Sequence, residues 1–235
     1  MVLRDFNYMK QILALLILSL MVAATPLRAQ RFHAYGLGGA ITSQVEGDEL
    51  KGFKHWGLTG GVGAFVDLDD NDRWSLAIET DYSCRGIYNN RHNSENLYNI
   101  RLNLHYVDIP LTLFFHDPYG GLRIGVGLVY SRLLSQPHDT VTYNPRYFVP
   151  DTTDMSFLKN DLAPAVEFRF NVWKGLQFSV RYQYSIIPIK RDWHYEFAGK
   201  TGSNNFYGSS VAFRLLWQFG EENSHNYSKK AKRRR

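Results

Sequence analysis

Cysteine is almost absent from this sequence of 235 residues, where Cys84 is the sole example. A single cysteine cannot form a disulfide within the chain, so the fold is not a small disulfide-bonded scaffold. A lone thiol also falls short of the sets of cysteine and histidine that hold structural zinc. The stability of this chain must therefore come from packing and hydrogen bonds.

Long apolar runs and helical periodicity are also scarce. The longest apolar run is "ILALLILSLMVAA" at 12–24, which is shorter than the roughly 20 residues of a membrane-spanning helix. Arg4 and Lys10 precede this run, and Ala29 offers a small residue at its end. This order is typical of a secretory signal peptide, so we expect residues 1–29 to direct export.

Basic residues are concentrated at the ends of the chain, although the formal net charge is +5. Residues 1–29 hold three basic residues and one acid, and the tail "KKAKRRR" at 229–235 holds six basic residues. Removing both leaves 18 basic and 21 acidic residues in the body, a net charge of −3. We expect 221–235 to be a disordered polar and basic tail on the periplasmic side, and an exported chain argues against a nucleic-acid partner.

Alternation with a period of two is the dominant pattern. From Tyr207 to Phe219 the odd positions are mainly apolar or aromatic and the even positions are mainly small or polar, as in a strand with two different faces. Four further segments show the same alternation, two more are rich in glycine and small residues, and a hydrophobic stretch that contains a proline makes the eighth strand. These seven segments lie at 34–44, 56–68, 74–83, 102–115, 122–131, 166–172 and 176–186.

The connections alternate between short and long. Tight turns are expected at 69–72, 117–121 and 173–175, and long loops at 45–55, 84–100, 137–160 and 191–204. Short turns at one end and long loops at the other are typical of outer-membrane barrels of Gram-negative bacteria. We predict an all-β fold for residues 30–220: a closed eight-stranded antiparallel transmembrane β-barrel with up-and-down meander order. A soluble lipocalin-like barrel is the alternative, but small residues on the polar face favour a filled lumen.

The polar faces carry four acids and four arginines. Because an isolated buried charge is costly, we expect these groups to pair in a structural network that fills the narrow lumen. A narrow polar conduit is the alternative. The residues are Glu79, Asp81, Asp108, Arg123, Glu167, Arg169, Arg181 and Arg214.

No motif for catalysis, metal or cofactor binding stands out. His105 lies on the polar parity of its strand near Asp108, which would suit a Ser–His–acid lipid enzyme, but the spacing selects no nucleophile. "DLDDNDRW" at 67–74 lacks the glycine and glutamate of a calcium loop, and the glycine-rich stretches lack phosphate-loop spacing. We therefore predict a non-enzymatic protein without cofactor or metal.

The expected long loops are rich in aromatic residues. Exposed loops are where binding residues gather, so these aromatics could contact a glycan or a protein, or could pack against one another. The candidate residues are Tyr143, Tyr147, Phe148, Trp193 and Tyr195.

Pro110 lies inside the hydrophobic segment "YVDIPLTLFF" at 106–115, although proline cannot donate to a strand ladder. The apolar parity changes from even to odd numbers at Tyr106–Val107. This change predicts a β-bulge in this strand, with a bend that places Asp108 among the arginines.

Several segments resemble the PorT-like outer-membrane β-barrel proteins of the Bacteroidota. They are "GGAITSQVEGDELKGFKHWGLTGGVGAFV" at 38–66, "AIETDYSCRG" at 77–86, "YVDIPLTLFF" at 106–115 and "RYQYSIIPI" at 181–189. The resemblance implies an outer-membrane barrel and brings no catalytic residues. Some members of that family are implicated in type IX protein secretion.

Three functions follow as expectations. The first is a non-enzymatic outer-membrane barrel whose extracellular loops bind or scaffold a partner, and the second is an accessory component of type IX secretion. A lipid-modifying enzyme or a narrow pore ranks behind both. The expected partners are outer-membrane lipid and secretion-system or cell-envelope proteins.

Overall fold

The computed structural model describes residues 32–46, 52–69, 71–89, 98–117, 121–135, 140–143, 148–150, 156–197 and 200–219. The expected signal peptide at 1–29 and the expected tail at 221–235 lie outside these ranges. Within them, no helix is long and apolar enough to span a membrane.

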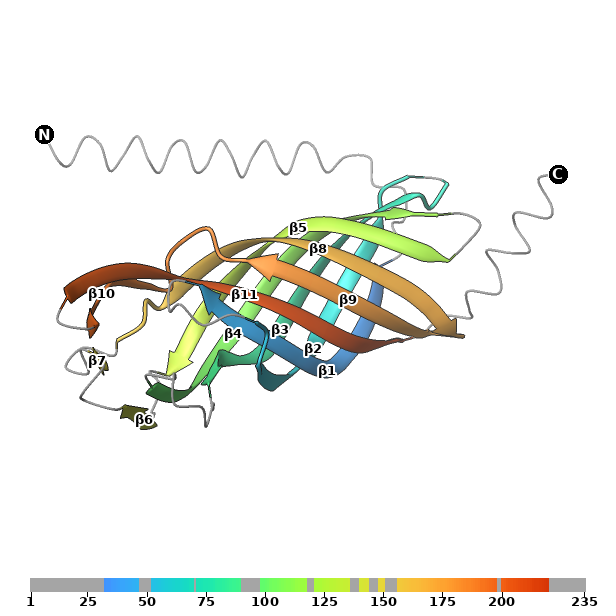
Figure 1. Ribbon diagram of the computed structural model, residues 1–235. Coiled ribbons are helices and arrows are strands. Elements are labelled where there is room, and N and C mark those ends of the chain that lie inside the picture. The colour runs from blue at the N-terminus through green and yellow to red at the C-terminus, as the bar shows by residue number, and fades with distance from the viewer. Residues whose placement is uncertain are drawn as a thin grey trace, which may run out of the picture. The chain divides into compact units, whose positions relative to one another are not determined.

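Eight long strands form a closed antiparallel barrel (Figure 1). Each pairs with the next long strand along the chain, and the first pairs with the last from Tyr35–Gln218 to Glu46–Tyr207. This confirms the predicted closed eight-stranded meander. The strands are β1 Phe32–Glu46, β2 His55–Asp67, β3 Trp74–Asn89, β4 Tyr98–His116, β5 Leu122–Ser135, β8 Asn160–Trp173, β9 Leu176–Tyr184 and β11 Lys200–Gln218.

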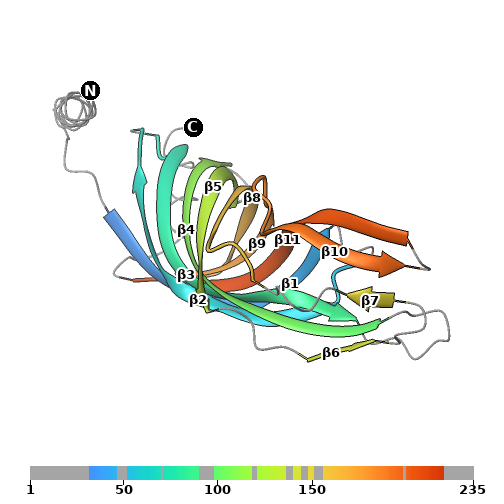
Figure 2. The ribbon, with the colours of Figure 1, turned by 90° about the vertical axis from the view of Figure 1, so that its left-hand side faces the viewer.

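Three shorter strands extend one end of the barrel (Figure 2). β6 (Thr140–Tyr143) pairs with β4, β7 (Phe148–Pro150) pairs with β10, and β10 (Lys190–Phe197) pairs with β11. The expectation of plain loops at 137–160 and 191–204 is therefore wrong for these strands. β4 and β11 contain 19 residues each, more than the roughly 9–11 that cross a bilayer, so both continue beyond the membrane.

The outer surface is apolar in its middle and aromatic at both edges. Leucine, valine, isoleucine and phenylalanine side chains that would be buried in a soluble protein are exposed here, as expected for a surface in contact with lipid. Aromatic side chains mark the two ends of this band. Trp74, Trp173 and Trp217 lie at the short-turn end, and Trp56, Tyr82, Tyr130 and Tyr182 lie toward the long-loop end.

Glycine permits close contact between the first and last strands. A Cβ atom added to Gly39 would lie 2.0 Å from the carbonyl oxygen of Phe213, whereas one added to Gly38 would meet nothing within 4 Å. Gly39 is therefore required by the packing of β1 on β11, and Gly38 is not.

The structure corrects the prediction for the strand that contains Pro110. Even-numbered residues of β4 are buried from Leu102 onward, so the predicted change of parity is wrong. Tyr106 pairs with Leu133 and His105 with Ser135, so the extra residue of the bulge is Leu134 in β5. The sequence misled because interior positions of β4 near the long-loop end are apolar rather than polar.

Pro110 itself interrupts one ladder without a shift of register. The pairing of β3 with β4 passes from Ile78–Leu111 to Asp81–Asp108, so the two intervening positions lack ladder pairs while the alignment stays constant. On its other side Pro110 still pairs with Val129. The missing N–H thus costs local hydrogen bonds in an otherwise regular strand.

Candidate functional site

The interior of the barrel is arranged in layers. Toward the short-turn end, a cluster of apolar side chains includes Tyr35, Phe65 and Phe114. Toward the long-loop end, a second cluster includes Leu102, Leu104 and Phe157. Charged side chains fill the space between the two clusters. The candidate site is this charged middle, which we divide into a central network and an outer network.

The central network is built on two glutamates and three arginines. Glu79 of β3 accepts from Arg169 and Tyr35 on Oε1, and from Arg181 and Arg214 on Oε2. Glu167 of β8 accepts from Arg169 Nε at 2.6 Å and Arg214 Nη2 at 2.6 Å on Oε1, and from Arg181 Nε at 2.8 Å on Oε2. Five strands, β1, β3, β8, β9 and β11, are therefore tied together across the lumen.

Asp81 completes the charge balance of the central network. Its Oδ2 lies 3.3 Å from Arg181 Nη1 and 3.2 Å from Arg214 Nη1, while its Oδ1 has no hydrogen-bond partner among the described residues. Three carboxylates thus face three guanidinium groups, and all six side chains are buried. A balanced network of this kind avoids the penalty of an unpaired buried charge.

The outer network centres on Arg85, a residue that the sequence prediction missed. Its guanidinium donates to Asp108 Oδ1 and to Ser131 Oγ, and it lies 3.6 Å from Asp161 Oδ2. Ser83 Oγ donates to Asp108 Oδ2 at 2.7 Å. Asp108 therefore pairs with Arg85 and not with the four predicted arginines. The alternation Ser83–Arg85 continues the polar parity of its strand, so a longer strand prediction would have found it.

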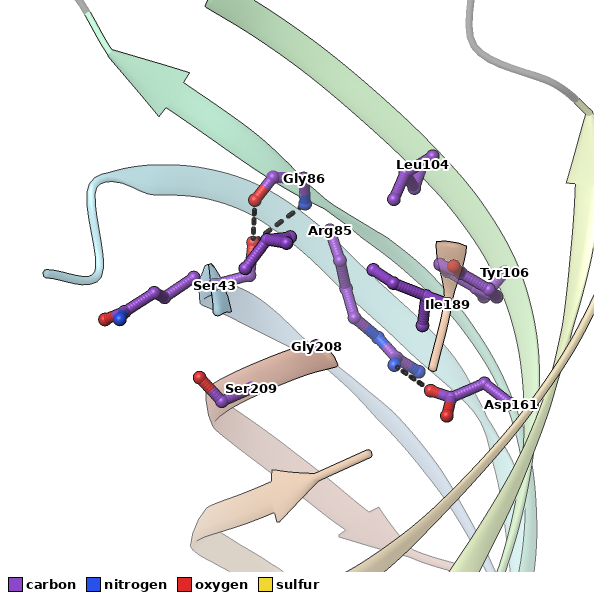
Figure 3. Close-up of a pocket in the computed structure, with 11 residues that line it drawn as sticks. Ser43, Arg85, Gly86, Leu104, Tyr106, Asp161, Ile189, Gly208 and Ser209 are labelled. Atoms are coloured by element: carbon purple, nitrogen blue, oxygen red, sulfur yellow. Dashed lines mark hydrogen bonds and ion pairs between the residues drawn. The ribbon is translucent and has the colours of Figure 1, made fainter. Parts of the chain in front are cut away.

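A small cavity lies beside the outer network (Figure 3). Arg85 reaches across it toward Asp161, and Tyr106 lines the same space. The hydroxyl of Tyr106 and Oδ1 of Asp161 have no hydrogen-bond partner among the described residues, although both side chains are buried. The cavity has room for about one water molecule, which suits solvation of these two groups rather than an organic ligand.

A serine, a histidine and an asparagine are hydrogen-bonded in series near this cavity. Ser43 Oγ lies 3.2 Å from His55 Nδ1, and His55 Nε2 lies 2.9 Å from Asn103 Oδ1. Catalytic triads share this order of contacts. Ser43 is buried, however, and its hydroxyl accepts from the Gly86 N–H at 2.8 Å and lies 3.1 Å from the Gly86 carbonyl oxygen (Figure 3). We interpret these contacts as a structural brace. The Ser43 side chain on β1 bonds the Gly86 backbone on β3, at the end of the barrel where β2 begins with His55.

Comparison with protein families identifies the type of barrel. The model of the outer membrane protein beta-barrel domain matches residues 12–219. The chain belongs to this family. It is an integral outer-membrane β-barrel protein of Gram-negative type, as the sequence predicted.

Solved structures of similar barrels come from other bacteria. Neisserial surface protein A is 11% identical, with 79% of this chain and 97% of that chain covered and a TM-score of 0.43. Ail, the attachment invasion locus protein of Yersinia pestis, is 14% identical in its complex with the heparin analogue sucrose octasulfate, covering 80% and 99%, with a TM-score of 0.41. OprG from Pseudomonas aeruginosa is 11% identical, covering 82% and 98%, with a TM-score of 0.38. No curated protein gives a significant match.

Two predicted residues of this outer-membrane barrel lie apart from the two networks. Arg123 faces the interior but stacks over the ring of Phe65 at 5.1 Å, near the short-turn end. His105 faces outward, because it pairs with Cys84 on the outer side of β3, and its Nδ1 lies 2.6 Å from the hydroxyl of the exposed Tyr82. The prediction that His105 belongs to the polar interior is therefore wrong.

Four of the five candidate aromatic residues fall on short strands at the long-loop end of the barrel. Tyr143 lies on β6, Phe148 on β7, and Trp193 and Tyr195 on β10. β7 aligns with β10 so that Tyr195 pairs with Pro150. Tyr147 lies outside the described residues.

Metal binding finds no support in the described part of the chain. No group of three or more His, Cys, Asp or Glu side chains there could hold a metal ion. In the segment 67–74, Asp69 Oδ1 instead accepts from the backbone N–H groups of Arg73 and Trp74, which is the behaviour of a polar turn.

Proposed function

We propose that this protein is a non-enzymatic surface barrel, whose extracellular strands and loops bind or scaffold a partner outside the cell. The observation that carries this proposal is the length of the strands at one end. β4 and β11 continue well past the bilayer, and β6, β7 and β10 add to the same end (Figure 2). Structure of this extent is unnecessary for membrane anchoring alone.

The filled interior supports a surface role rather than transport. Two charged networks and two apolar clusters occupy the lumen in succession, and the buried arginines are held by several bonds each. Passage of a solute would require these bonds to break together. In addition, the Ser43–His55 contact is buried and its hydroxyl is engaged by Gly86, which argues against use of Ser43 as a nucleophile.

Replacement of the β10–β11 hairpin tests this proposal. We expect a variant in which 191–204 is replaced by a two-residue turn to fold, as shown by heat-modifiable migration on a gel, and to lose surface crosslinks that the wild-type protein forms on intact cells. A matched variant with a shortened 69–72 turn, at the opposite end, should keep them. Unchanged crosslinks in the hairpin variant would contradict the proposal, as would solute flux through the wild-type barrel in liposomes.

A role as an accessory component of type IX secretion is the second candidate. It is supported by the PorT-like segments at 77–86 and 106–115, which lie side by side on β3 and β4 with Tyr82 paired to Val107 and Ser83 to Tyr106. Deletion of the gene should block export of proteins that carry the C-terminal signal of that system. Unchanged export in the deletion strain would exclude this role and leave the surface-binding proposal intact.

A further inference from the structure

Four neighbouring strands form a continuous row of outward-facing residues near the extracellular edge of the barrel. Tyr82 of β3 pairs with Val107 of β4, Val107 pairs with Arg132 of β5, and Arg132 pairs with Asn160 of β8. His105 lies two residues beyond Val107 on the same face of β4. We call Tyr82, His105, Tyr130, Arg132 and Asn160 the outer patch.

The outer patch lies where the lipid-facing band changes from apolar to polar. Toward the middle of the bilayer, the same strands expose Ile78, Leu111, Leu128 and Val166, which are 39–53% accessible. Tyr82 and Tyr130 belong to the aromatic residues that mark the edge of this band. Such aromatic side chains sit at the level of the lipid headgroups, so the patch is placed to meet them.

Arg132 is held in position by a single contact. Its Nη1 donates to Asn160 Oδ1 at 2.9 Å, and the hydroxyl of Tyr130 donates to the same oxygen at 3.0 Å. The side chain of Arg132 is exposed, and its remaining N–H groups have no partner among the described residues. A guanidinium group presented in this way can form a bidentate contact with a phosphate.

His105 adds a second nitrogen donor to the patch. The hydroxyl of Tyr82 engages Nδ1 at 2.6 Å, and the two rings are stacked with centroids 5.9 Å apart. This contact fixes the ring and leaves Nε2 for another partner. The outward faces of β3, β4, β5 and β8 carry no Asp or Glu among their described residues, so the local charge is positive.

We propose that the outer patch binds the phosphate group of an outer-leaflet lipid headgroup, such as that of lipid A. Arg132 provides the charge, and Asn160, Tyr130 and Tyr82 position the two donors. A basic side chain at the headgroup level attracts an anionic lipid, while the apolar strands below contact its acyl chains. The interaction is independent of the extracellular strands and goes beyond the proposed surface role.

Lipid retention by the purified full-length protein tests this site. The protein is incorporated into phosphatidylcholine nanodiscs that contain bisphosphorylated lipid A or chemically dephosphorylated lipid A, and bound lipid is measured by native mass spectrometry. We expect wild-type protein to retain the phosphorylated form preferentially. Arg132→Gln should lower this retention about fivefold, the factor expected for one basic residue near an anionic headgroup.

Matched variants and a competitor decide the interpretation. Arg73→Gln removes an exposed arginine from the opposite end and should retain lipid A like the wild type. Arg132→Lys should show intermediate retention, because lysine keeps the charge but cannot form the bidentate contact. Equal retention of both lipids by the wild type, or equal retention by wild type and Arg132→Gln, would overturn the proposal. Release of lipid A by micromolar inorganic phosphate would also overturn it, because free phosphate would then outcompete the membrane-held headgroup and would be the ligand of the patch.

Discussion

Replacement of Arg181 by leucine removes one of the two cations of the central network that contact all three of its carboxylates. Its guanidinium contacts Glu79, Asp81 and Glu167, with 2.7 Å to Glu167 Oε2 and 3.3 Å to Asp81 Oδ2. In the variant Arg181→Leu, three buried carboxylates would face only two guanidinium groups. The lumen would then hold one uncompensated negative charge away from bulk water.

The expected cost is about 3 kcal/mol in the free energy of unfolding, since loss of one partner from a buried ion pair costs roughly 3–5 kcal/mol. The lower end applies because Glu79 and Glu167 each keep bonds to Arg169 and Arg214. Asp81 keeps only its contact with Arg214, at 3.2 Å. The double variant Arg181→Leu, Asp81→Asn restores the balance of charge and should recover part of the loss.

Unfolding in urea, with the barrel reconstituted in lipid vesicles and followed by heat-modifiable migration and tryptophan fluorescence, measures this difference. Arg73→Leu provides the control, because Arg73 is exposed in a turn and its change should alter stability by less than about 0.5 kcal/mol. If Arg181→Leu unfolds at the same urea concentration as the wild type, Arg181 does not neutralise the interior acids and the described network is wrong.

Three further predictions follow from the packing. Gly39→Ala should lower the free energy of unfolding by about 2–3 kcal/mol because its Cβ would meet the Phe213 carbonyl oxygen, whereas Gly38→Ala should be nearly neutral; equal urea midpoints for the two variants would refute the close contact of β1 with β11. Ser43→Ala should cost about 1–3 kcal/mol because it leaves the Gly86 N–H unbonded; an unchanged unfolding curve would contradict the brace. Trp74, Trp173 and Trp217 are exposed on the lipid side, so brominated lipids should quench their fluorescence; single-tryptophan variants that are not quenched would show that these side chains face away from the bilayer.

Alternation was sufficient to predict the fold because barrel closure depends on local pattern. In β9 and in most of β8 and β11 the predicted inner residues are the buried ones, including Glu167, Arg169, Arg181 and Arg214. Each of these strands has a polar inner face and a lipid-facing outer face, so hydrophobicity reports orientation directly.

The same reasoning failed where the interior is apolar. The apolar even-numbered residues before the predicted change of parity are Leu102, Leu104 and Tyr106. Their hydrophobicity suggests the lipid side, yet they are buried inside with Phe157 and Ile189. A leucine on a barrel strand has no property that distinguishes a lipid-facing position from a filled lumen. Only the register of β4 against β3 and β5 decides between the two, and register depends on the whole barrel.

The partners of individual charges were beyond sequence reasoning for a related reason. Asp108 and Glu79 both face inward from neighbouring strands, but Asp108 bonds Arg85 and Glu79 bonds three other arginines. Their level along the barrel axis, set by the tilt and stagger of the strands, determines which cation each can reach. The sequence predicts that acids and arginines both face the interior. It does not predict that these charges separate into two networks.

The two networks and the interruption at Pro110 are linked through β3 and β4. The ladder is missing at Glu79 and Pro110, which is the level of the central network, while the pair Asp81–Asp108 joins the central to the outer network. At the same level the Glu79 side chain accepts from Tyr35, Arg169, Arg181 and Arg214, on β1, β8, β9 and β11. At this level contacts across the lumen therefore add to a wall in which only β3 and β4 lack ladder pairs. A barrel braced in this way is rigid and closed in its middle, which leaves its extracellular strands and its outer patch as the surfaces through which it can act.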